Sequence, residues 1–428
     1  MHKVLIITYY WPPAGGPGVQ RWLKFVKYLP ENGILPLVYV PKNPTYPIVD
    51  PSLNKEVPKD LEVYSTNIFE PYNIASFFGK KKARQISSGV IASKDQSTLE
   101  KLLLWIRGNL FIPDARKFWI KPSFDYLLPI IKEQQIDTII TTGPPHSIHL
   151  IGLALSEHTK IRWIADFRDP WTSISYHKKL RLSKKAKEKH KSLEKQVLQS
   201  CDELIVTSET TKLEFEKLTA KRIHVITNGF DVAISTLKPE GLDVKFSLSH
   251  IGSMLSDRNP LNLWVAISEL LHENKVFKDL FKLQLVGVVG EQVLQSLKDY
   301  GIMDNTIYKG YVSHQEAIEF QRRSQVLLLV EIDSQETQGI IPGKLFEYFA
   351  AKRPILGIGP KKWEAGDMII DSKAGVVFDY LNKQELKELL LNWFNLFLQE
   401  KLKVESVHIE KYSRKSLTLK LAQKLLWE

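Results

Sequence analysis

Residues 246–254, FSLSHIGSM, look like the first strand of a second sheet, and they decide the predicted fold. A comparable stretch, KVLIITYY at residues 3–10, opens the chain, and after each of the two stretches apolar runs alternate with helical periodicity. Continuous apolar strands separated by helices favour a parallel sheet that is covered by helices on both faces. The sequence therefore predicts an α/β protein with two βα domains of similar size.

The alternation of strands and helices starts again at residue 246, and this point sets the predicted domain boundaries. We expect a first Rossmann-like domain at residues 1–230, with an insertion at about 41–121 where the alternation of strands and helices is lost. A second Rossmann-like domain is expected at residues 246–400, after a weakly periodic linker that contains proline and glycine. Residues 411–428 are predicted to form a basic amphipathic helix.

The composition limits the class of protein. The 428 residues are 43% hydrophobic and 25% charged, which is typical of a globular chain with more than one core. Cys201 is the only cysteine, so a disulfide framework is excluded. Because no apolar run reaches about 18 residues and the N-terminus lacks a signal-peptide pattern, we expect a cytoplasmic protein.

The net charge of +11 is unevenly distributed and indicates an anionic partner. Residues 178–195 contain nine Lys or Arg against two Glu, and a second basic cluster follows two phenylalanines within residues 77–84. Aromatic side chains beside lysines suit an anionic membrane surface, although a solvated helix face explains residues 178–195 equally well. Residues 101–120 mix apolar and basic side chains, which fits either an insertion that packs on the core or a surface that meets lipid.

The polar residues of interest follow predicted strands, because ligands of doubly wound domains bind beyond the carboxyl ends of the strands. After the first strand, WPPAGGPGVQRW contains Gly15 and Gly16, which allow the backbone to approach a ligand closely. The amides of the following helix would face an anion. The stretch is neither a dinucleotide fingerprint nor a Walker loop, so we predict a phosphate- or sugar-facing loop, with a plain tight turn as the alternative.

Two further loops follow strands of the first domain. TGPPHS, residues 142–147, places His146 in the first turn of a helix, where we expect a substrate contact; a structural histidine is the alternative. DFRDPWT, residues 166–172, carries Asp166, Arg168 and Asp169, and these charges are costly unless paired. They form either an internal salt bridge or contacts to sugar hydroxyls, with a carboxylate as general base.

The second domain shows the same arrangement. Gly252 ends the first strand of this domain, and Arg258 follows as a residue that can grip a phosphate with two hydrogen bonds. Gly343 opens a helix in which Lys344 adds positive charge and Glu347 lies one turn further on. A simple surface ion pair between Lys344 and Glu347 is the alternative. No Asp-x-Asp motif occurs, so neither a metal nor another cofactor is expected.

Four motifs together resemble a known family. YYWPPAGGPGVQRW, TGPPHS with DFRDPWT, TNGFD at residues 227–231 and PGKLFEYFAAKRPIL at residues 342–356 are similar to motifs of nucleotide-sugar glycosyltransferases of family 4, of the bacterial surface-polysaccharide type. The resemblance implies the GT-B fold, in which two Rossmann-like domains face each other across a cleft and the C-terminal helix crosses back to the N-terminal domain. Relatives usually carry two glutamates separated by seven residues. The second matches Glu347 in this last motif, whereas the first falls on Gly339, just before the motif, where backbone amides are expected to replace it.

The resemblance also implies roles for individual residues. Arg258 and Lys344 would neutralise the diphosphate, Glu347 would bind the ribose, and His146 would bind the donor sugar. The predicted catalytic residues are Arg258, Lys344, His146 and Asp169; the predicted donor-binding residues are Gly15, Gly16, Gly252, Gly343 and Glu347; and Arg168 and Asp166 are predicted to form the wall of the cleft or to meet the acceptor.

The predicted function is the transfer of a sugar from a nucleoside-diphosphate sugar to a glycan or lipid-linked acceptor in cell-envelope polysaccharide synthesis. Retention of configuration follows from the resemblance. The expected partners are the nucleotide-sugar, the acceptor and an anionic membrane surface at the inner face, without nucleic acid. A nucleotide-sugar epimerase of the same fold and a non-catalytic, basic nucleic-acid-binding protein are the alternatives.

Overall fold

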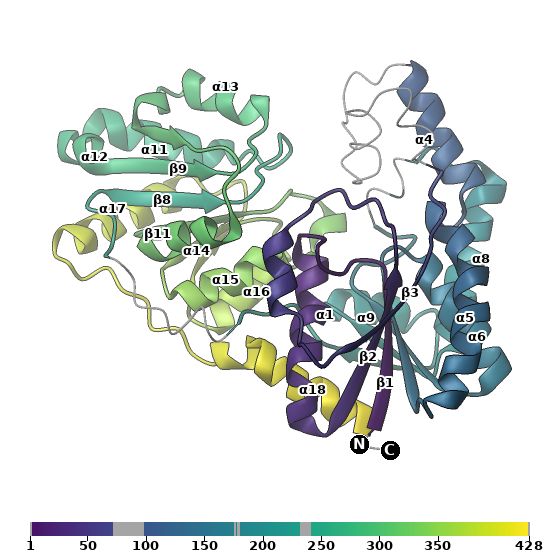
Figure 1. Cartoon of the computed structure of the whole chain (residues 1–428). Helices are drawn as coiled ribbons and strands as arrows, with labels where there is room; N and C mark the ends of the chain where they lie inside the picture. The colour runs from purple at the N-terminus through teal and green to yellow at the C-terminus, as the bar shows by residue number, and fades with distance from the viewer. Residues whose placement is uncertain (1, 72–97, 175–176, 178–179, 232–240, 427–428) are drawn as a thin grey trace. The chain divides into compact units, whose positions relative to one another are not determined.

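The computed structural model describes residues 2–71, 98–174, 177, 180–231 and 241–426. The chain divides into two compact units, one made of Met1–Thr227 with Leu417–Glu428 and the other of Asn228–Ser416. Each unit contains one parallel sheet with helices around it (Figure 1), which confirms the predicted pair of Rossmann-like α/β domains. The basic cluster within residues 77–84 and residues 178–179 lie outside the described residues.

The first unit is built on a seven-stranded sheet with the order β3-β2-β1-β4-β5-β6-β7. Its strands are β1 (His2–Thr8), β2 (Ile34–Pro41), β3 (Glu62–Thr66), β4 (Thr138–Gly143), β5 (Arg162–Phe167), β6 (Glu203–Val206) and β7 (Arg222–Val225). All the pairs are parallel, and Ile6 of β1 lies opposite Val38 on one side and Ile140 on the other. The order reverses at β1, so the loops after β1 and β4 meet at the switch point where such sheets bind ligands.

The helices of the first unit cover its sheet. They are α1 (Pro17–Tyr28), α4 (Thr98–Leu110), α5 (Ile120–Glu133), α6 (Ser147–Thr159), α8 (Lys184–Ser200), α9 (Glu209–Phe215) and the C-terminal α18 (Arg414–Leu426), with the short helices η1 (Pro30–Asn32), η2 (Pro51–Glu56) and η4 (Ala115–Trp119). Leu421 and Leu425 of α18 are buried in the core of this unit. Arg162 of β5 donates Nη1 to the carbonyl oxygen of Leu425 at 2.9 Å, so the end of the chain is fixed to the N-terminal sheet.

One strand lies where the sequence predicts an insertion. β3 pairs in parallel with β2 and places Val63 opposite Val38, so it extends the sheet by an edge strand within residues 41–121. The sequence pattern does not predict this strand. An edge strand has one side open to solvent, and Val63 is 43% exposed; such a strand therefore needs no continuous apolar run.

The second unit is built on a six-stranded parallel sheet with the order β10-β9-β8-β11-β12-β13. Its strands are β8 (Phe246–Ile251), β9 (Phe281–Val286), β10 (Thr306–Tyr308), β11 (Val326–Val330), β12 (Ile355–Ile358) and β13 (Gly375–Phe378). Its helices are α11 (Leu261–Glu273), α12 (Lys275–Leu280), α13 (Glu291–Asp299), α14 (His314–Arg323), α15 (Gly343–Ala351), α16 (Glu364–Asp371) and α17 (Gln384–Leu398), with η5 (Met303–Asn305), η6 (Gln335–Thr337) and η7 (Ile409–Tyr412).

The central strand β11 explains why this sheet needs helices on both faces. Val326, Leu328 and Val330 belong to one buried apolar cluster, whereas Leu327 and Leu329 belong to another. Successive side chains of a strand point to opposite faces, so both faces of the sheet are apolar. The run VLLLV therefore forms a strand that is buried on both sides.

Candidate functional site

The carboxyl end of β11 in the second unit holds a buried carboxylate that fixes a cation. Glu331 follows β11 directly and is fully buried. Arg258, in the loop after β8, donates Nε to Oε1 of Glu331 at 3.0 Å and Nη2 to Oε2 at 3.1 Å. This paired contact fixes the plane of the guanidinium, while 23% of the Arg258 side chain remains exposed. The sequence predicts Arg258 but not Glu331, although Glu331 ends the most apolar run of the domain.

Lys344 lies close to the same strand end. Its ammonium is 3.1 Å from Nε2 of His250, the penultimate residue of β8. The other ring nitrogen, Nδ1, lies 3.0 Å from the carbonyl oxygen of Leu328. An assignment with the proton on Nδ1 lets Nε2 accept a hydrogen bond from Lys344. Burial, followed by the charge of Lys344, keeps the pKa of His250 well below its usual range, so the ring is neutral.

The surroundings of Lys344 disfavour the charged form of its amine. Burial lowers the pKa of Lys344 to about 7, and the charge of Arg258 also lowers it, although Glu331 and Glu347 oppose the shift. A nearby negative charge favours the protonated form of an amine. An anionic ligand at this strand end would therefore raise the pKa of Lys344 and bind together with a proton.

Gly252 makes room for this arrangement. It follows β8 directly with a φ of 110°, in the region that glycine adopts without strain. A Cβ atom at Gly252 would lie 2.8 Å from Nζ of Lys344. Glycine at this position therefore allows both the turn of the backbone and the approach of the ammonium.

Glu347 and Lys344 bind different partners. Glu347 accepts a hydrogen bond from Nε2 of Gln321 on α14 at 2.7 Å, and Nδ1 of His314 lies 3.8 Å from its other oxygen. No ion pair joins Glu347 to Lys344 in the described part of the chain. The alternative of a simple surface pair is therefore excluded, and Gln321 and His314 are contacts that the sequence does not predict.

The start of α15 adds free amides. Pro342 precedes the helix without a side-chain cap, and the backbone N–H groups of Gly343 and Lys344 donate to no acceptor among the described residues. The amide of Gly339, at the position where the resemblance places a glutamate in relatives, also donates to no described group. Free amides at a helix N-terminus attract anions. This edge of the sheet therefore combines two cations with unsatisfied donors.

In the first unit, Asp166 is an internal anchor. It is fully buried and accepts hydrogen bonds from Nη2 of Arg21 at 3.0 Å, from Nε1 of Trp22 at 2.7 Å and from Oγ1 of Thr142 at 2.8 Å. Arg21 is also fully buried, so the two charges neutralise each other inside the protein. Asp166 holds α1 and β4 against β5, and this burial does not support the prediction that it meets a ligand. The partner is Arg21, not the neighbouring Arg168.

Arg168 connects the two loops that the sequence singles out. Its backbone amide and its Nε both donate to the carbonyl oxygen of Gly143 at 3.1 Å, and its Nη2 donates to Pro144. The guanidinium also lies against the first turn of α1, where a Cβ atom on Gly18 would be only 1.9 Å from Nη1. The loops after β4 and β5 are therefore adjacent, and a fixed positive charge lies beside the glycine-rich helix start.

His146 is buried without a hydrogen-bond partner. The residue is 4% exposed, its ring stacks on Trp171 with centroids 4.9 Å apart, and neither ring nitrogen has a partner among the described residues. Burial, followed by the neighbouring histidines, holds the pKa of His146 well below its usual range. A buried polar group without a partner is costly. Both ring nitrogens are also withdrawn from solvent, so a ligand atom reaches them only if neighbouring side chains move.

Asp169 is half-buried and makes no hydrogen bond to the described residues. Burial raises the pKa of Asp169, although the charge of Arg168 opposes the shift. The glycine loop after β1 is ordered by backbone contacts: Gly15 donates its amide to Ile48 at 3.0 Å, and Gly16 caps α1 with a φ of 100°. Their roles toward a ligand stay predictions.

The family model of Glycosyltransferase Family 4 matches residues 82–234, about a third of the chain. No curated protein matches the sequence. The fold is shared with a glycosyltransferase from Rickettsia africae ESF-5 (15% identity, 100% of this chain and 99% of that chain, TM-score 0.59) and with WaaG, a glycosyltransferase involved in lipopolysaccharide biosynthesis (13%, 99% and 100%, 0.57). The chain has the GT-B fold.

The family match describes glycosyltransferases, and it supports a glycosyltransferase here as the sequence predicts. The structural similarities show only the fold of this protein and nothing of its reaction. A putative UDP-N-acetylglucosamine 2-epimerase from Listeria monocytogenes has the same fold (11% identity, 99% of this chain and 95% of that chain, TM-score 0.55). The fold by itself therefore does not separate transfer from epimerisation.

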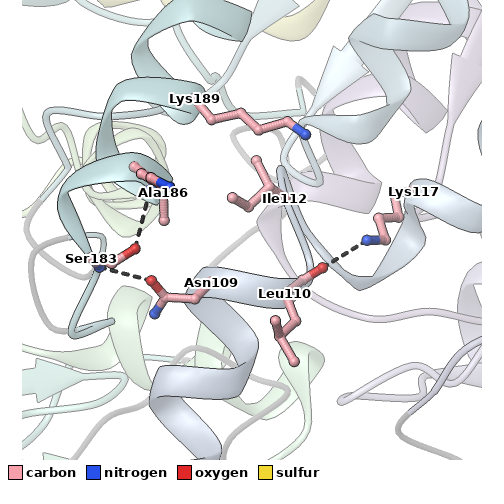
Figure 2. Close-up of a pocket in the computed structure, with 8 residues that line it drawn as sticks. Asn109, Leu110, Ile112, Lys117, Ser183, Ala186 and Lys189 are labelled. Atoms are coloured by element: carbon pink, nitrogen blue, oxygen red, sulfur yellow. Dashed lines mark hydrogen bonds between the residues drawn. The ribbon is translucent and has the colours of Figure 1, made fainter.

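The first unit of the GT-B protein also contains a basic pocket of about 220 Å³ where α4 meets α8 (Figure 2). Lys117, Lys185 and Lys189 line it, and no acidic side chain is among its described lining residues. Ser183, which caps α8, donates its amide to Oδ1 of Asn109 on α4 at 2.7 Å, so the two helices are joined. In the described ranges, no helix is both long enough and apolar enough to cross a bilayer.

Proposed function

We propose that the protein transfers a sugar from a nucleoside-diphosphate sugar to a glycan or lipid-linked glycan during synthesis of a surface polysaccharide. The observation that carries the proposal is the strand end of the second unit, where Arg258, Lys344 and the free amides of α15 provide an anion site. A diphosphate matches these donors in charge, and Glu347 supplies acceptors for ribose hydroxyls. The lipopolysaccharide role of WaaG supports the polysaccharide context.

The proposed chemistry needs charge stabilisation above all. As the glycosidic bond breaks, the sugar becomes oxocarbenium-like and negative charge grows on the departing diphosphate. Arg258, held by Glu331, and Lys344, placed by His250, are cations whose positions are fixed before the reaction. Since contacts that strengthen in the transition state raise turnover, loss of either cation is expected to lower kcat more than it raises KM. No metal ion or other cofactor takes part in the proposed step.

Groups of the first unit are proposed to contact the sugars. His146 offers two ring nitrogens without protein partners, and Asp169 offers a carboxylate without a described donor. We propose that His146 binds a sugar hydroxyl and that Asp169 orients the acceptor. Retention of configuration belongs to the same proposal, and NMR of the anomeric proton in the first-formed product tests it: inversion would contradict a retaining mechanism.

The donor site is tested by binding. A thermal-shift screen against UDP-, GDP-, ADP- and dTDP-sugars identifies the nucleotide, because a ligand that binds the folded state raises its stability. Arg258→Ala is expected to weaken the best binder by roughly 10- to 100-fold, since a hydrogen bond to a charged group contributes about 1.5–3 kcal/mol.

Arg323→Ala is the matched control for this variant. Arg323 also pairs with a carboxylate, Asp243, at 3.2 Å, but on the exposed side of α14, and its loss is expected to leave donor binding unchanged. The proposal is wrong if no sugar nucleotide stabilises the protein or if Arg258→Ala binds as the wild type does.

Product analysis separates transfer from epimerisation. A transferase releases the nucleotide when an acceptor takes the sugar, or slowly when water acts as the acceptor. An epimerase converts the sugar without any acceptor. An altered sugar nucleotide in an acceptor-free reaction would favour the epimerase.

We further propose that the first unit rests on an anionic membrane through α4 and α8. Leu102 and Trp105 of α4 are 52% and 42% exposed. Phe118 is also exposed, and it follows Lys117, which lines the basic pocket. Exposed apolar side chains beside lysines suit the interface of an anionic bilayer. The proposal requires contact with the surface of the bilayer only.

Vesicle flotation tests the membrane contact. The protein is expected to float with phosphatidylglycerol vesicles at low salt and to stay behind with neutral vesicles. Leu102→Ser should weaken flotation, whereas Leu213→Ser should not, although Leu213 on α9 is 59% exposed against 52% for Leu102. Equal recovery with anionic and neutral vesicles, or none with either, would contradict the proposal.

A further inference from the structure

A pocket of about 460 Å³ lies at one end of the first sheet, outside the groups discussed so far. Three neighbouring strands deliver its lining at their carboxyl ends: Trp11 comes after β1, Lys42 follows β2 directly and Ser65 is the penultimate residue of β3. Ligands of doubly wound sheets bind at this end of the strands. The volume lies in the range of small-molecule sites.

The walls of the pocket are apolar and rigid. Prolines and valines supply much of the lining, together with the ring of Tyr46. The Tyr46 hydroxyl donates to the carbonyl oxygen of Tyr9 at 3.1 Å, and the rings of Tyr46 and Tyr9 meet edge to face with centroids 5.7 Å apart. Tyr46 is therefore fixed in place before any ligand arrives, so its ring serves as a wall that needs no rearrangement on binding.

Polar groups without partners distinguish this pocket from a simple apolar groove. The indole N–H of Trp11, the ammonium of Lys42, the amide of Asn54 and the hydroxyl of Ser65 make no hydrogen bond to the described residues. Trp11 is 4% exposed, and its indole nitrogen is not among the fully buried side-chain atoms that lack a partner, so this donor remains accessible. A purely apolar ligand would bury these groups without partners, which costs free energy.

We propose that this pocket binds one sugar unit of the acceptor, and that Lys42 recognises an anionic substituent on it. A pyranose ring has apolar faces for the proline, valine and tyrosine walls, and its hydroxyls match the free groups of Trp11, Asn54 and Ser65. No Asp or Glu is among the described residues that line the pocket, so Lys42 has no competing carboxylate there. The substituent is a carboxylate, as in a uronic acid, or a sugar phosphate.

That the bound sugar belongs to an acceptor rests on the proposed transferase function. Binding of the sugar itself is tested independently of that function. Saturation-transfer NMR on the full chain uses methyl glucoside, glucuronic acid and glucose 6-phosphate as probes, with no nucleotide present. We expect transfer to the sugar protons, and at least about a fivefold tighter Kd for one of the two anionic sugars than for methyl glucoside. The tighter anion identifies the substituent as carboxylate or phosphate.

Two pairs of variants locate the binding. Lys42→Glu should remove the preference for the anion, whereas Lys59→Glu, the same change at an exposed lysine outside the pocket, should keep it. Val63→Trp fills the pocket from β3 and should abolish transfer for all the probes. Val276→Trp is its control, because Val276 on α12 is 52% exposed against 43% for Val63.

Several results overturn the proposal. Binding of none of the three sugars refutes the pocket as a sugar site, and so does wild-type binding by Val63→Trp. An unchanged anion preference in Lys42→Glu refutes the role of Lys42, even if Val63→Trp fails to fold. Binding of the sugar nucleotide is measured on the same variants. A variant that still binds the sugar nucleotide but no longer binds the sugar probes supports the acceptor pocket. A wild-type protein that binds the sugar probes but no sugar nucleotide would refute only the transferase function.

Discussion

The pH dependence of donor affinity follows from the environment of Lys344. In the free protein this ammonium has a pKa of about 7, since burial and Arg258 outweigh the nearby carboxylates. His250 stays neutral across this range because its own pKa is well below the usual value. A bound diphosphate favours the protonated amine, so we expect the donor to bind the form that carries the proton.

The size of the change in donor affinity follows from the pKa of Lys344. With a pKa of about 7, roughly 90% of Lys344 is protonated at pH 6 and roughly 10% at pH 8. The apparent affinity for the sugar nucleotide should therefore fall about tenfold between pH 6 and pH 8, or about 1.4 kcal/mol. The sign is fixed: affinity decreases as pH rises through 7, and binding above pH 7 takes up a proton.

Isothermal titration calorimetry measures both quantities. The intact sugar nucleotide is the right ligand, because its diphosphate is esterified at both ends and lacks the terminal phosphate ionisation near pH 6 that a free nucleotide carries. Titrations at pH 8 in two buffers of different ionisation enthalpy report the proton uptake directly. Lys344→Met should bind weakly and with a flat pH profile, whereas Lys361→Met, at an exposed lysine, should behave like the wild type.

Constant affinity of the wild type between pH 6 and pH 8 would refute this reasoning. A slope that persists in Lys344→Met would also refute it, because another group would then be titrating.

Two further changes probe the packing of each unit. Asp166→Ala should lower the free energy of unfolding by about 3–5 kcal/mol, because it leaves the buried charge of Arg21 without its partner; urea denaturation measures this, and a loss under about 1 kcal/mol would mean that Arg21 finds another acceptor. Gly252→Ala should weaken donor binding at least about tenfold, since its Cβ would lie 2.8 Å from Nζ of Lys344 at a φ of 110°; wild-type donor affinity in this variant would show that the ammonium does not need its present position.

Strand positions and family motifs together identified most of the strand-end residues but not their partners. Gly252 and Arg258 are visible because they stand in the loop after the apolar run of β8, and Lys344 is visible because it belongs to the PGKLFEYF motif. Glu331 and His250 belong to the strand signals themselves, where a single polar residue is easily taken as part of the strand. One usable signal exists for Glu331: a carboxylate that directly follows a five-residue apolar run needs a buried cation.

Local sequence periodicity determined the architecture of this protein. The alternation of apolar strands with helices, and its restart at residue 246, are properties of neighbouring residues, so they predict two doubly wound sheets without any knowledge of long-range contacts. Glycines and cations at the strand ends are local features of the same kind. Even β3 was missed for a local reason, because an edge strand is only half covered.

Only the tertiary structure decided which charges are paired and which are available. Asp166 is bound by Arg21, 145 residues away in the chain, and Lys344 meets His250, 94 residues away. Hydrogen bonds and burial depend on distances in space, which the order of residues does not contain. For that reason the same sequence motif, DFRDPWT, holds one carboxylate that is fully neutralised inside the protein and another, Asp169, that keeps its oxygens free of described donors.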